Sequence, residues 1–478
     1  MTVPPAPDER LPDGFTVRLE PRTKRRDGGT ALLGGSPLRL LRLAPAARSL
    51  LDGDRLVVAD RRGAVVAGRL LDAGLAHPEL PPGDPAAVTV VVPVKDRARA
   101  LARLLAALRA DPDTAACPVV VVDDGSADPA AIAAVADQPG VRLLRHERNR
   151  GPSAARNTGL RVVQTPAVAF VDSDCVPAPG WLPRLAAHLA DPRIALVAPR
   201  ITGQPVKRPN WVVRYEAVGS AHDMGPRPAP VVPWSAVAYV PSAALLARRA
   251  ALGEGPDAGF DEAMEVAEDV DLVWRLVQAG WRVRYEPTAQ VAHDHRAEPG
   301  EWLRRRAFYG TGAALLAQRH PGAVAPVVVS PGAASVWLLA VLGGRAGRVA
   351  AAAVLAGSTV RMARRLRVPG RPLPAGLAAS VVARGTGASA RTLGRAVTRH
   401  HWPLAVLACL GSRRARRVVA GIAVADAVIG WWPRRADVTL ADFAAGRRLE
   451  DLAYGAGLWA GVVRARDPRA LLPARPRT

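Results

Sequence analysis

The fold of this chain is decided by the stretch Ala87-Val-Thr-Val-Val-Val-Pro93, a continuous apolar run that is soon followed by the acidic residue Asp96. An apolar run of this length is typical of a strand that is buried on both faces of a parallel sheet. Residues 99–108 then carry leucines at helical spacing, which predicts an amphipathic helix. A strand followed by a helix in this way predicts the start of a βαβ unit.

The same alternation continues along the chain. Further strands are predicted at residues 119–122, 141–144 and 168–171, with helices between them. Right-handed crossovers of this kind build a mostly parallel sheet with helices on both faces. Ligands of such sheets bind at the carboxyl ends of the strands. We therefore predict an α/β catalytic domain over residues 86–310.

A small domain is predicted ahead of it, over residues 1–80. The stretch Phe15-Thr-Val-Arg-Leu19 alternates like a strand, and two glycine pairs, Gly28-Gly29 and Gly34-Gly35, punctuate two more short strands. The leucine-rich residues 38–51 suggest a helix. A proline-rich joint at residues 78–85 ends this α+β domain.

The remaining residues, 311–478, are rich in alanine and in arginine clusters, which predicts an α-helical C-terminal region. The uncharged run between Arg319 and Arg345 is long enough to span a bilayer, but Pro326 and Pro331 interrupt it. Contact with the cell membrane through residues 320–432 and ordinary buried helices are therefore the two alternatives.

Composition excludes several classes of protein. The formal net charge is +23, but nearly all of it is arginine and no basic run is interleaved with aromatic residues, so no nucleic-acid partner is expected. Three distant cysteines predict neither a disulfide framework nor a zinc knuckle. The first residues lack the basic start and apolar core of a secretory signal, so we expect the catalytic domain in the cytoplasm.

Acidic residues recur at the carboxyl ends of the predicted strands. Asp96 follows the first strand, Asp123 and Asp124 follow the second, and Asp172 and Asp174 follow the fourth. Carboxylates in these places can accept hydrogen bonds from a nucleoside, and a closely spaced pair can ligate Mg²⁺ or Mn²⁺. Each motif alone is also a common turn, but their shared position favours a binding edge.

A possible diphosphate site follows in Asn149-Arg-Gly-Pro-Ser-Ala-Ala-Arg156-Asn-Thr-Gly159. Gly151 and Pro152 break the chain ahead of a helix, whose amide dipoles and Arg156 could face an anion. The alternative is an ordinary helix start with a solvated arginine.

Residues for catalysis and for the acceptor come later in the chain. Glu268 and Asp269 open a helix, where Asp269 could be a general base or both carboxylates could simply cap the helix. Trp234 and Tyr239 could stack on a sugar ring, although core packing is equally consistent with Tyr239. His293 ends a predicted strand and could complete a metal site, or be a surface histidine.

In order, these motifs resemble those of the family 2 glycosyltransferases, which have the glycosyltransferase A-type nucleotide-diphospho-sugar fold. The motifs are Pro93-Val-Lys-Asp96, Asp123-Asp124-Gly-Ser126, Gly151 to Gly159, Asp172-Ser-Asp174 and Glu268-Asp269. The resemblance implies an inverting, metal-dependent transfer from a nucleotide-sugar donor. Processive synthases of the family carry Gln-x-x-Arg-Trp after the base motif, and its absence here argues against a channel-forming synthase.

The resemblance also implies roles for single residues. Asp96 and Asp124 would hold the nucleoside, Asp172 the ribose or the donor sugar, Asp174 the Mg²⁺ or Mn²⁺ ion, and Asp269 would be the catalytic base. Beyond the resemblance, our own interpretation of the residues adds Pro93, Asp123 and Arg156 to the donor site, His293 to the metal site, and Trp234, Tyr239 and Glu268 to the acceptor site.

A narrower resemblance concerns the beginning of the chain. Residues 26–41 resemble the start of the glycosyltransferases of mycofactocin biosynthesis, and the N-terminal domain is similar to small peptide-recognition domains. This implies transfer of glucose from UDP-glucose to a peptide-derived redox cofactor or its precursor, with the N-terminal domain contacting the acceptor. The alternatives are a membrane-associated transferase for a lipid-linked cell-wall or polysaccharide acceptor, and a non-catalytic module that binds nucleotide sugars.

Overall fold

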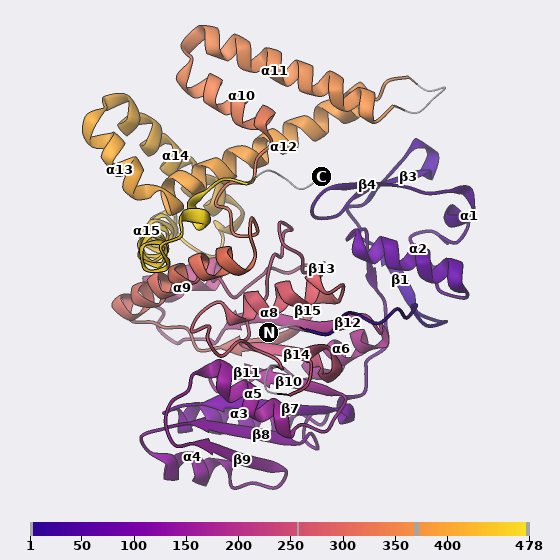
Figure 1. The fold of residues 1–478 in the computed structure, drawn as a ribbon, viewed down its shortest axis with the longest axis vertical. Helices are drawn as coiled ribbons and strands as arrows, with labels where there is room; N and C mark the ends of the chain where they lie inside the picture. The colour runs from indigo at the N-terminus through magenta and orange to yellow at the C-terminus, as the bar shows by residue number, and fades with distance from the viewer. Residues whose placement is uncertain (1–2, 256–257, 368–371, 475–478) are drawn as a thin grey trace. The chain divides into compact units, whose positions relative to one another are not determined.

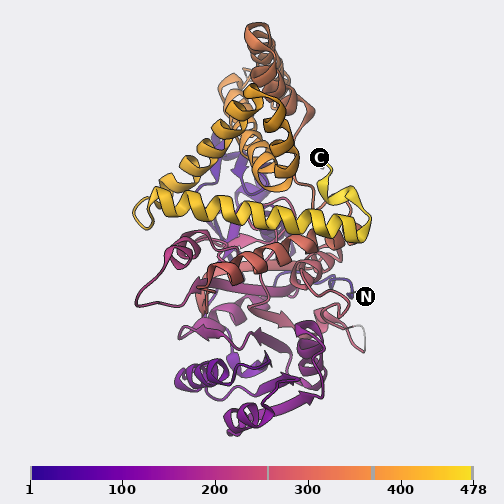
Figure 2. The same cartoon turned by 90° about the vertical axis from the view of Figure 1, so that its left-hand side faces the viewer.

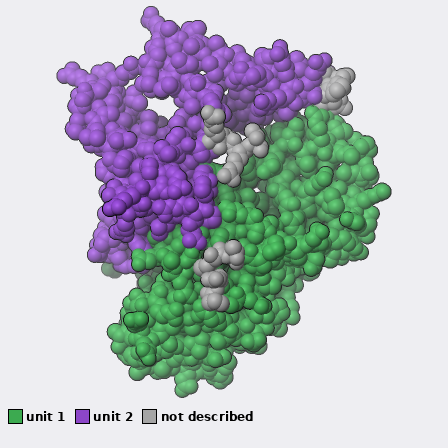
Figure 3. All heavy atoms as spheres, in the orientation of Figure 1, with its two compact units in different colours: residues 1–208, 219–295 green, residues 209–218, 296–478 purple. Residues whose placement is uncertain are grey.

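The computed structural model describes residues 3–255, 258–367 and 372–474. The chain divides into two compact units, which Figure 3 colours separately. Unit 1 comprises Met1–Arg208 and Gly219–His295, and unit 2 comprises Pro209–Val218 and Arg296–Thr478.

Unit 1 begins with two small antiparallel sheets around an apolar core of their own. The first has the order β5-β1-β6 and the second the order β2-β3-β4. Their strands are β1 (Thr16–Leu19), β2 (Lys24–Arg26), β3 (Ala31–Gly34), β4 (Arg39–Arg42), β5 (Arg55–Val57) and β6 (Ala76–Pro78). Two helices accompany them, α1 (Pro45–Arg48) and α2 (Arg61–Asp72).

The helix suggested over the leucine-rich residues 38–51 is wrong for its first part. Residues 39–42 form strand β4, because Leu40 and Leu41 pair with Leu33 and Leu32 of β3 in an antiparallel hairpin. In the remainder of the stretch 38–51, only the four residues of α1 are helical. The partner strand, which lies before the Gly34-Gly35 turn, therefore decides the conformation over the local leucine spacing.

The rest of unit 1 is a mixed sheet in the order β11-β15-β12-β14-β10-β7-β8-β9, with β13 beside β15 (Figure 1). The predicted parallel strands form one side of it, because β10, β7, β8 and β9 are all parallel. Strand β14 is antiparallel to both of its neighbours and joins this side to the parallel pair β12 and β15. The strands are β7 (Val88–Val94), β8 (Val119–Asp124), β9 (Val141–His146), β10 (Ala167–Val171), β11 (Cys175–Pro177), β12 (Ile194–Gly203), β13 (Ala229–Pro230), β14 (Ala244–Arg248) and β15 (Arg282–His293).

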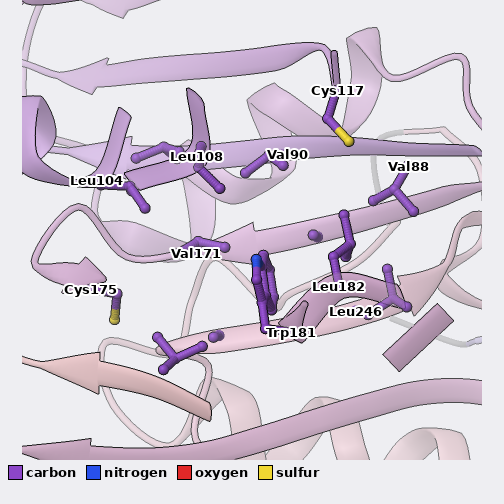
Figure 4. Packing of buried hydrophobic residues seen from close by; sticks show 14 of the residues in the cluster. Val88, Val90, Leu104, Leu108, Cys117, Val171, Cys175, Trp181, Leu182 and Leu246 are labelled. Atoms are coloured by element: carbon purple, nitrogen blue, oxygen red, sulfur yellow. The ribbon is translucent and has the colours of Figure 1, made fainter. Parts of the chain in front are cut away.

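Helices cover both faces of this sheet, as the sequence predicts. They are α3 (Ala98–Ala110), α4 (Pro129–Ala136), α5 (Pro152–Val162), α6 (Trp181–Ala186) and α8 (Glu268–Gln278). On one face, Val90 packs with Leu104 of α3 and Trp181 of α6 in the main core (Figure 4). On the other face, Gly159 of α5 lies so close to Val91 that a Cβ there would be 2.3 Å from its Cγ1.

Unit 2 is helical, which confirms the prediction for the C-terminal region. Its main helices are α9 (Pro299–Arg319), α10 (Pro331–Leu342), α11 (Gly344–Arg365), α12 (Ala375–Arg395), α13 (Trp402–Gly411), α14 (Arg413–Trp431) and α15 (Leu440–Ala465). Helices α9 and α15 lie side by side (Figure 2). Glycine permits this approach, because a Cβ on Gly457 would be 1.7 Å from the carbonyl oxygen of Ala307.

The uncharged run between Arg319 and Arg345 does not form one helix. It begins directly after α9 and consists of an irregular segment, the 12 residues of α10 and the turn into α11. Within the described parts of the chain, no helix has both the length and the apolar character needed to cross a membrane.

Candidate active site

The carboxyl ends of the parallel strands bring the first predicted site residues together. Strands β7 and β8 run in register from Val90 and Val119 to Val94 and Asp123, so the loops that follow them share one edge of the sheet. There the backbone N–H of Asp96 donates to Ser126 Oγ (2.9 Å), and its Oδ1 accepts from the N–H of Ala127 (2.7 Å). The two loops are therefore joined through Asp96, which is itself exposed.

Asp123 and Asp124 are both buried and organise this edge from within. Asp123 accepts from the N–H of Ser126 (2.9 Å) and so closes its own turn. Asp124 accepts from His146 Nδ1 (2.8 Å) and from the N–H groups of Arg150 and Gly151 (2.8 Å each). Its carboxylate therefore fixes the loop that leads into α5.

Glycine is needed at one point of this edge. Gly125 has a φ of 73°, and a Cβ there would lie 2.6 Å from the backbone of Arg148 and Asn149. The loop after β8 and the loop before α5 can approach this closely only because the residue between Asp124 and Ser126 has no side chain.

Arg156 is the centre of a buried ionic bridge rather than a solvated side chain, since only 2% of it is exposed. Its Nη2 donates to Asp172 Oδ1 (2.6 Å) and its Nη1 to Glu268 Oε1 (3.2 Å). Its guanidinium also lies over the ring of Phe260, 5.2 Å from the centroid. Burial lowers the pKa of Arg156, but the charges of Asp172 and Glu268 outweigh this and raise it overall.

The charge of Arg156 also affects the pKa of Asp172. Burial raises the pKa of Asp172, and the neighbouring Arg156 charge opposes that rise. The backbone of Asp172 is also fixed, because its N–H donates to the carbonyl of Ala243 (2.9 Å). Its side chain is still partly exposed at the edge of the sheet.

The two residues predicted to hold a metal face each other. Strand β11 pairs with the end of β15 so that Cys175 lies opposite His293, and this places His293 Nε2 3.6 Å from Asp174 Oδ1. The other oxygen of Asp174 contacts Arg97. His293 Nδ1 is buried and has no hydrogen-bond partner among the described residues.

These side chains fit a divalent cation in part. A carboxylate and an imidazole converge, and a guanidinium already occupies the other carboxylate oxygen. Within the described residues no group of three or more His, Cys, Asp and Glu side chains has the geometry of a metal site. The protein would thus supply two ligands, and oxygens of a bound diphosphate or water would complete the shell.

Asp269 stands at the start of α8 with a strongly perturbed carboxyl group. Burial, together with the adjacent Glu268 charge, raises the pKa of Asp269 to about 7. Its Oδ2 accepts from the N–H of Ser242 (3.1 Å) and its Oδ1 from that of Val270 (2.8 Å). A carboxyl group with a pKa near neutrality can take a proton at neutral pH, as a general base must.

The aromatic loop, residues 231–243, is held to the same helix. Trp274 of α8 donates from Nε1 to the carbonyl of Ala238 (2.8 Å), and Ser242 is bonded to Asp269. Trp234 has a φ of 68°, which is unusual for a bulky residue and marks local strain. Tyr239 donates to the carbonyl of Ala221 (3.2 Å) and is half-buried.

The N-terminal domain reaches this loop. Ser36 Oγ, in the turn between β3 and β4, accepts from the N–H of Ala236 at 2.7 Å. Nearby, a Cβ on Gly74 would lie 3.3 Å from the ring of Pro230, which shows how closely the two surfaces approach. The small domain therefore lies against the loop that carries the predicted acceptor aromatics.

Sequence reasoning missed several residues that support the site. His146 holds Asp124, Arg97 contacts Asp174, and Ser242 binds Asp269. His146 and Arg97 had a visible signal, since both are polar and follow or end predicted strands, whereas Ser242 had none. Pro93, predicted to bind the donor, lies inside β7 and is buried.

Comparison with known proteins decides the family. Residues 89–252 match the model of glycosyl transferase family 2. The pre-mycofactocin glycosyltransferase of Mycobacterium tuberculosis is 49% identical over 477 residues, which cover 97% of this chain and 98% of that protein. The chain belongs to glycosyl transferase family 2.

More distant relatives share only part of this glycosyltransferase. The N-acetylglucosaminyl-diphospho-decaprenol L-rhamnosyltransferase of M. tuberculosis is 30% identical over 238 residues, 43% of this chain and 76% of that protein. Among solved structures, a mannosyltransferase from Pyrobaculum calidifontis in complex with GDP-Man and Mn²⁺ is 23% identical with a TM-score of 0.38, covering 74% of this chain and 90% of that one.

The segment that matches the family model does not contain all of the candidate site residues. The matched segment contains Asp96, Asp124 and Asp172, but it ends at Leu252, ahead of Asp269 and His293. These two residues are joined to the matched part by contacts within unit 1, namely those with Ser242 and Asp174. The candidate site thus draws on both segments.

The ionic bridge makes a stability prediction. Replacing Arg156 with Met leaves Asp172 and Glu268 without their shared cation, and breaking a buried ion pair in this way costs about 3 kcal/mol. We expect the free energy of unfolding, measured by urea denaturation, to fall by about that amount. Arg161→Met on the same helix removes an exposed pair with Glu262 and should cost less than about 1 kcal/mol. Equal losses in the two variants would contradict the bridge.

Proposed function

We propose that this glycosyltransferase transfers a hexose, glucose from UDP-glucose, to a hydroxyl of mycofactocin or its precursor, with inversion and with a divalent metal. The end-to-end similarity to the pre-mycofactocin glycosyltransferase carries this proposal. A match over 97% of the chain includes the N-terminal domain and the helical unit, which a shared catalytic domain alone would not explain.

Asp269 is the proposed base. It accepts the proton of the acceptor hydroxyl while that oxygen bonds to the anomeric carbon, and the bond from this carbon to the diphosphate breaks with its electron pair leaving on UDP. One such displacement inverts the anomeric configuration. The pKa of about 7 suits this role, because a base is most effective when its pKa lies near the working pH.

Asp174 and His293 are proposed to hold Mg²⁺ or Mn²⁺. Their facing arrangement and the unpartnered, buried Nδ1 of His293 support this. When bound, the cation supplies positive charge that stabilises the leaving diphosphate. Arg97, which contacts Asp174, lies where it can add a second positive charge.

Asp96, Asp123, Asp124 and Asp172 are proposed to form the donor site with Pro93 and Arg156. We assign two different tasks to these residues. Asp96 and Asp172 retain exposure and can contact the nucleoside or the sugar. The buried members, Asp123, Asp124 and Arg156, position the loops around it through the hydrogen bonds described above.

Trp234, Tyr239 and Glu268 are proposed to receive the acceptor. The aromatic loop is bonded to both the helix of Asp269 and the N-terminal domain, so an acceptor on this loop lies between the base and Ser36. This supports a role of the N-terminal domain in recognising a peptide-derived acceptor. Glu268 acts here through Arg156, to which its carboxylate is bound.

A lipid-linked acceptor is the second candidate. The partial similarity to the N-acetylglucosaminyl-diphospho-decaprenol L-rhamnosyltransferase favours it, but this similarity covers only 43% of this chain. The alternative of a non-catalytic binding module is wrong, because the chain is 49% identical over 97% of its length to a glycosyltransferase. Transfer assays with a mycofactocin precursor and with a decaprenyl-linked sugar, each with UDP-glucose, separate these functions.

The base predicts a pH profile. Because Asp269 must be ionised and its pKa is raised to about 7, we expect kcat/KM for transfer to rise with pH through about 7 and then level off. Asp269→Asn should lower kcat about a thousandfold and remove this limb of the profile. UDP release coupled to acceptor glycosylation measures both. Glu265→Gln, an exposed change in the same segment, is the control; a wild-type profile without this limb would refute the assignment.

The metal site predicts a change in cation affinity. Asp174→Asn and His293→Ala should each weaken Mn²⁺ binding in the presence of UDP at least about tenfold, as read from the electron paramagnetic resonance of free Mn²⁺. Asp294→Asn is the control, because its half-exposed carboxylate pairs with Arg103. Unchanged Mn²⁺ affinity in both variants would place the cation elsewhere.

The acceptor loop predicts a selective effect on KM. Removing the indole by Trp234→Ala should raise the KM of the acceptor about tenfold, the equivalent of about 1.4 kcal/mol of lost stacking. The KM of UDP-glucose and the slow hydrolysis of UDP-glucose without acceptor should stay unchanged. Trp432→Ala, an exposed tryptophan of unit 2, is the control. A rise in the KM of the donor alone would move Trp234 to the donor site.

A further inference from the structure

Unit 2 presents apolar side chains that its own fold does not cover. None of the ten residues of α13, all of them described, is buried, although the helix reads Trp402-Pro-Leu-Ala-Val-Leu-Ala-Cys-Leu-Gly411. Leu407 is 64% exposed and Leu410 76% exposed. An apolar helix left open in this way marks an interaction site on a stable protein.

A second apolar group lies beside the end of α13. Leu338 and Leu342 of α10 and Val349 of α11 are exposed around the turn between these helices. Arg414, at the start of α14, donates from Nη2 to the carbonyls of Val341 (2.7 Å) and Leu342 (2.9 Å). This contact joins the α10–α11 turn to the α13–α14 turn, so the two apolar groups lie on neighbouring turns of unit 2.

Arginines surround these apolar groups. Arg413, Arg416 and Arg417 begin α14, and Arg345 and Arg348 begin α11; all five are exposed. The sequence around them has no negative side chains to balance these charges. Between Glu301 and Asp426 it has nineteen arginines and no Asp or Glu. This part of unit 2 is therefore both apolar and strongly cationic.

Helices α10 and α13 are long enough to lie on a membrane surface but too short to span a bilayer. Helix α13 has 10 residues and α10 has 12, so at about 1.5 Å per residue they extend roughly 15 and 18 Å. The hydrocarbon core of a bilayer is about 30 Å thick. Short apolar helices with flanking cations instead lie in the headgroup region, with leucines among the acyl chains and arginines at the phosphates.

We propose that unit 2 binds the surface of an anionic lipid membrane through a docking face, which consists of α13, the α10–α11 turn and the start of α14. Charge selects this occupant. A second copy of the chain would bring the same arginines together and be repelled, whereas anionic headgroups attract them. A nucleic acid would satisfy the arginines but would leave Leu407 and Leu410 against a polar backbone.

Flotation of the full chain with vesicles tests the docking face. We expect it to float with phosphatidylcholine vesicles that contain phosphatidylglycerol and not with pure phosphatidylcholine, and to be released at about 1 M salt, where screening reduces the attraction. R413E/R416E/R417E should lower the partition coefficient at least about tenfold, and L407S/L410S should lower it on the same vesicles. Arg414 is left unchanged because it bonds α10.

A matched control has the same change of charge elsewhere. R39E/R61E/R62E reverses three exposed arginines of unit 1 and should float like the unchanged protein. Thermal unfolding curves of all variants should coincide, since every substituted side chain is exposed. No flotation with anionic vesicles, equal loss in the control, or a concentration-dependent dimer that L407S/L410S abolishes would overturn the proposal. None of these outcomes bears on sugar transfer to a soluble acceptor, so the proposed function is tested separately.

Discussion

The site depends on one buried cation, the guanidinium of Arg156. It joins α5 to Asp172 at the end of β10 and to Glu268 at the start of α8, two segments almost a hundred residues apart in sequence. An unpaired charge in this position would be very costly, so the three groups must assemble together. Because Asp172 follows the parallel part of the sheet and Glu268 precedes the proposed base, this bridge sets the donor edge against the catalytic helix.

The same bridge explains why two adjacent carboxyl groups behave differently. Glu268 is paired with Arg156, whereas Asp269 receives only backbone N–H groups and also experiences the charge of its neighbour. Its pKa therefore rises towards neutrality. By linkage, a carboxyl group whose pKa is raised on folding stabilises the fold at low pH and loses that contribution as pH rises towards about 7. The ionised base is thus held at the expense of stability, which is typical of catalytic groups.

Sequence patterns predicted the parts of the fold that local periodicity determines. The buried valine run of β7 and the leucines of α3 have only one structural solution, and the acidic residues after the strands follow from it. Strand β4 could not be predicted in this way, because its leucines obtain their conformation from pairing with β3. The position of antiparallel β14 between two groups of parallel strands could likewise not be predicted, since strand order depends on contacts between residues distant in sequence.

For the site, sequence identified residue types but not their tasks. Arg156 was expected to face an anion, yet the carboxylates that bury it lie 16 and 112 residues away, and no local pattern reveals such partners. Asp124 was predicted to contact the donor, and the structure shows that its carboxylate also holds a loop through two N–H groups. Carboxylates at strand ends differ in how far they can serve a ligand, and this has a general cause. Buried backbone N–H groups must be hydrogen-bonded, so they use carboxylate oxygens nearby. A ligand can then bind only to an oxygen that the backbone leaves unused. Asp172, whose side chain keeps part of its exposure, is therefore a stronger candidate for a direct contact with the donor than its more deeply buried neighbours.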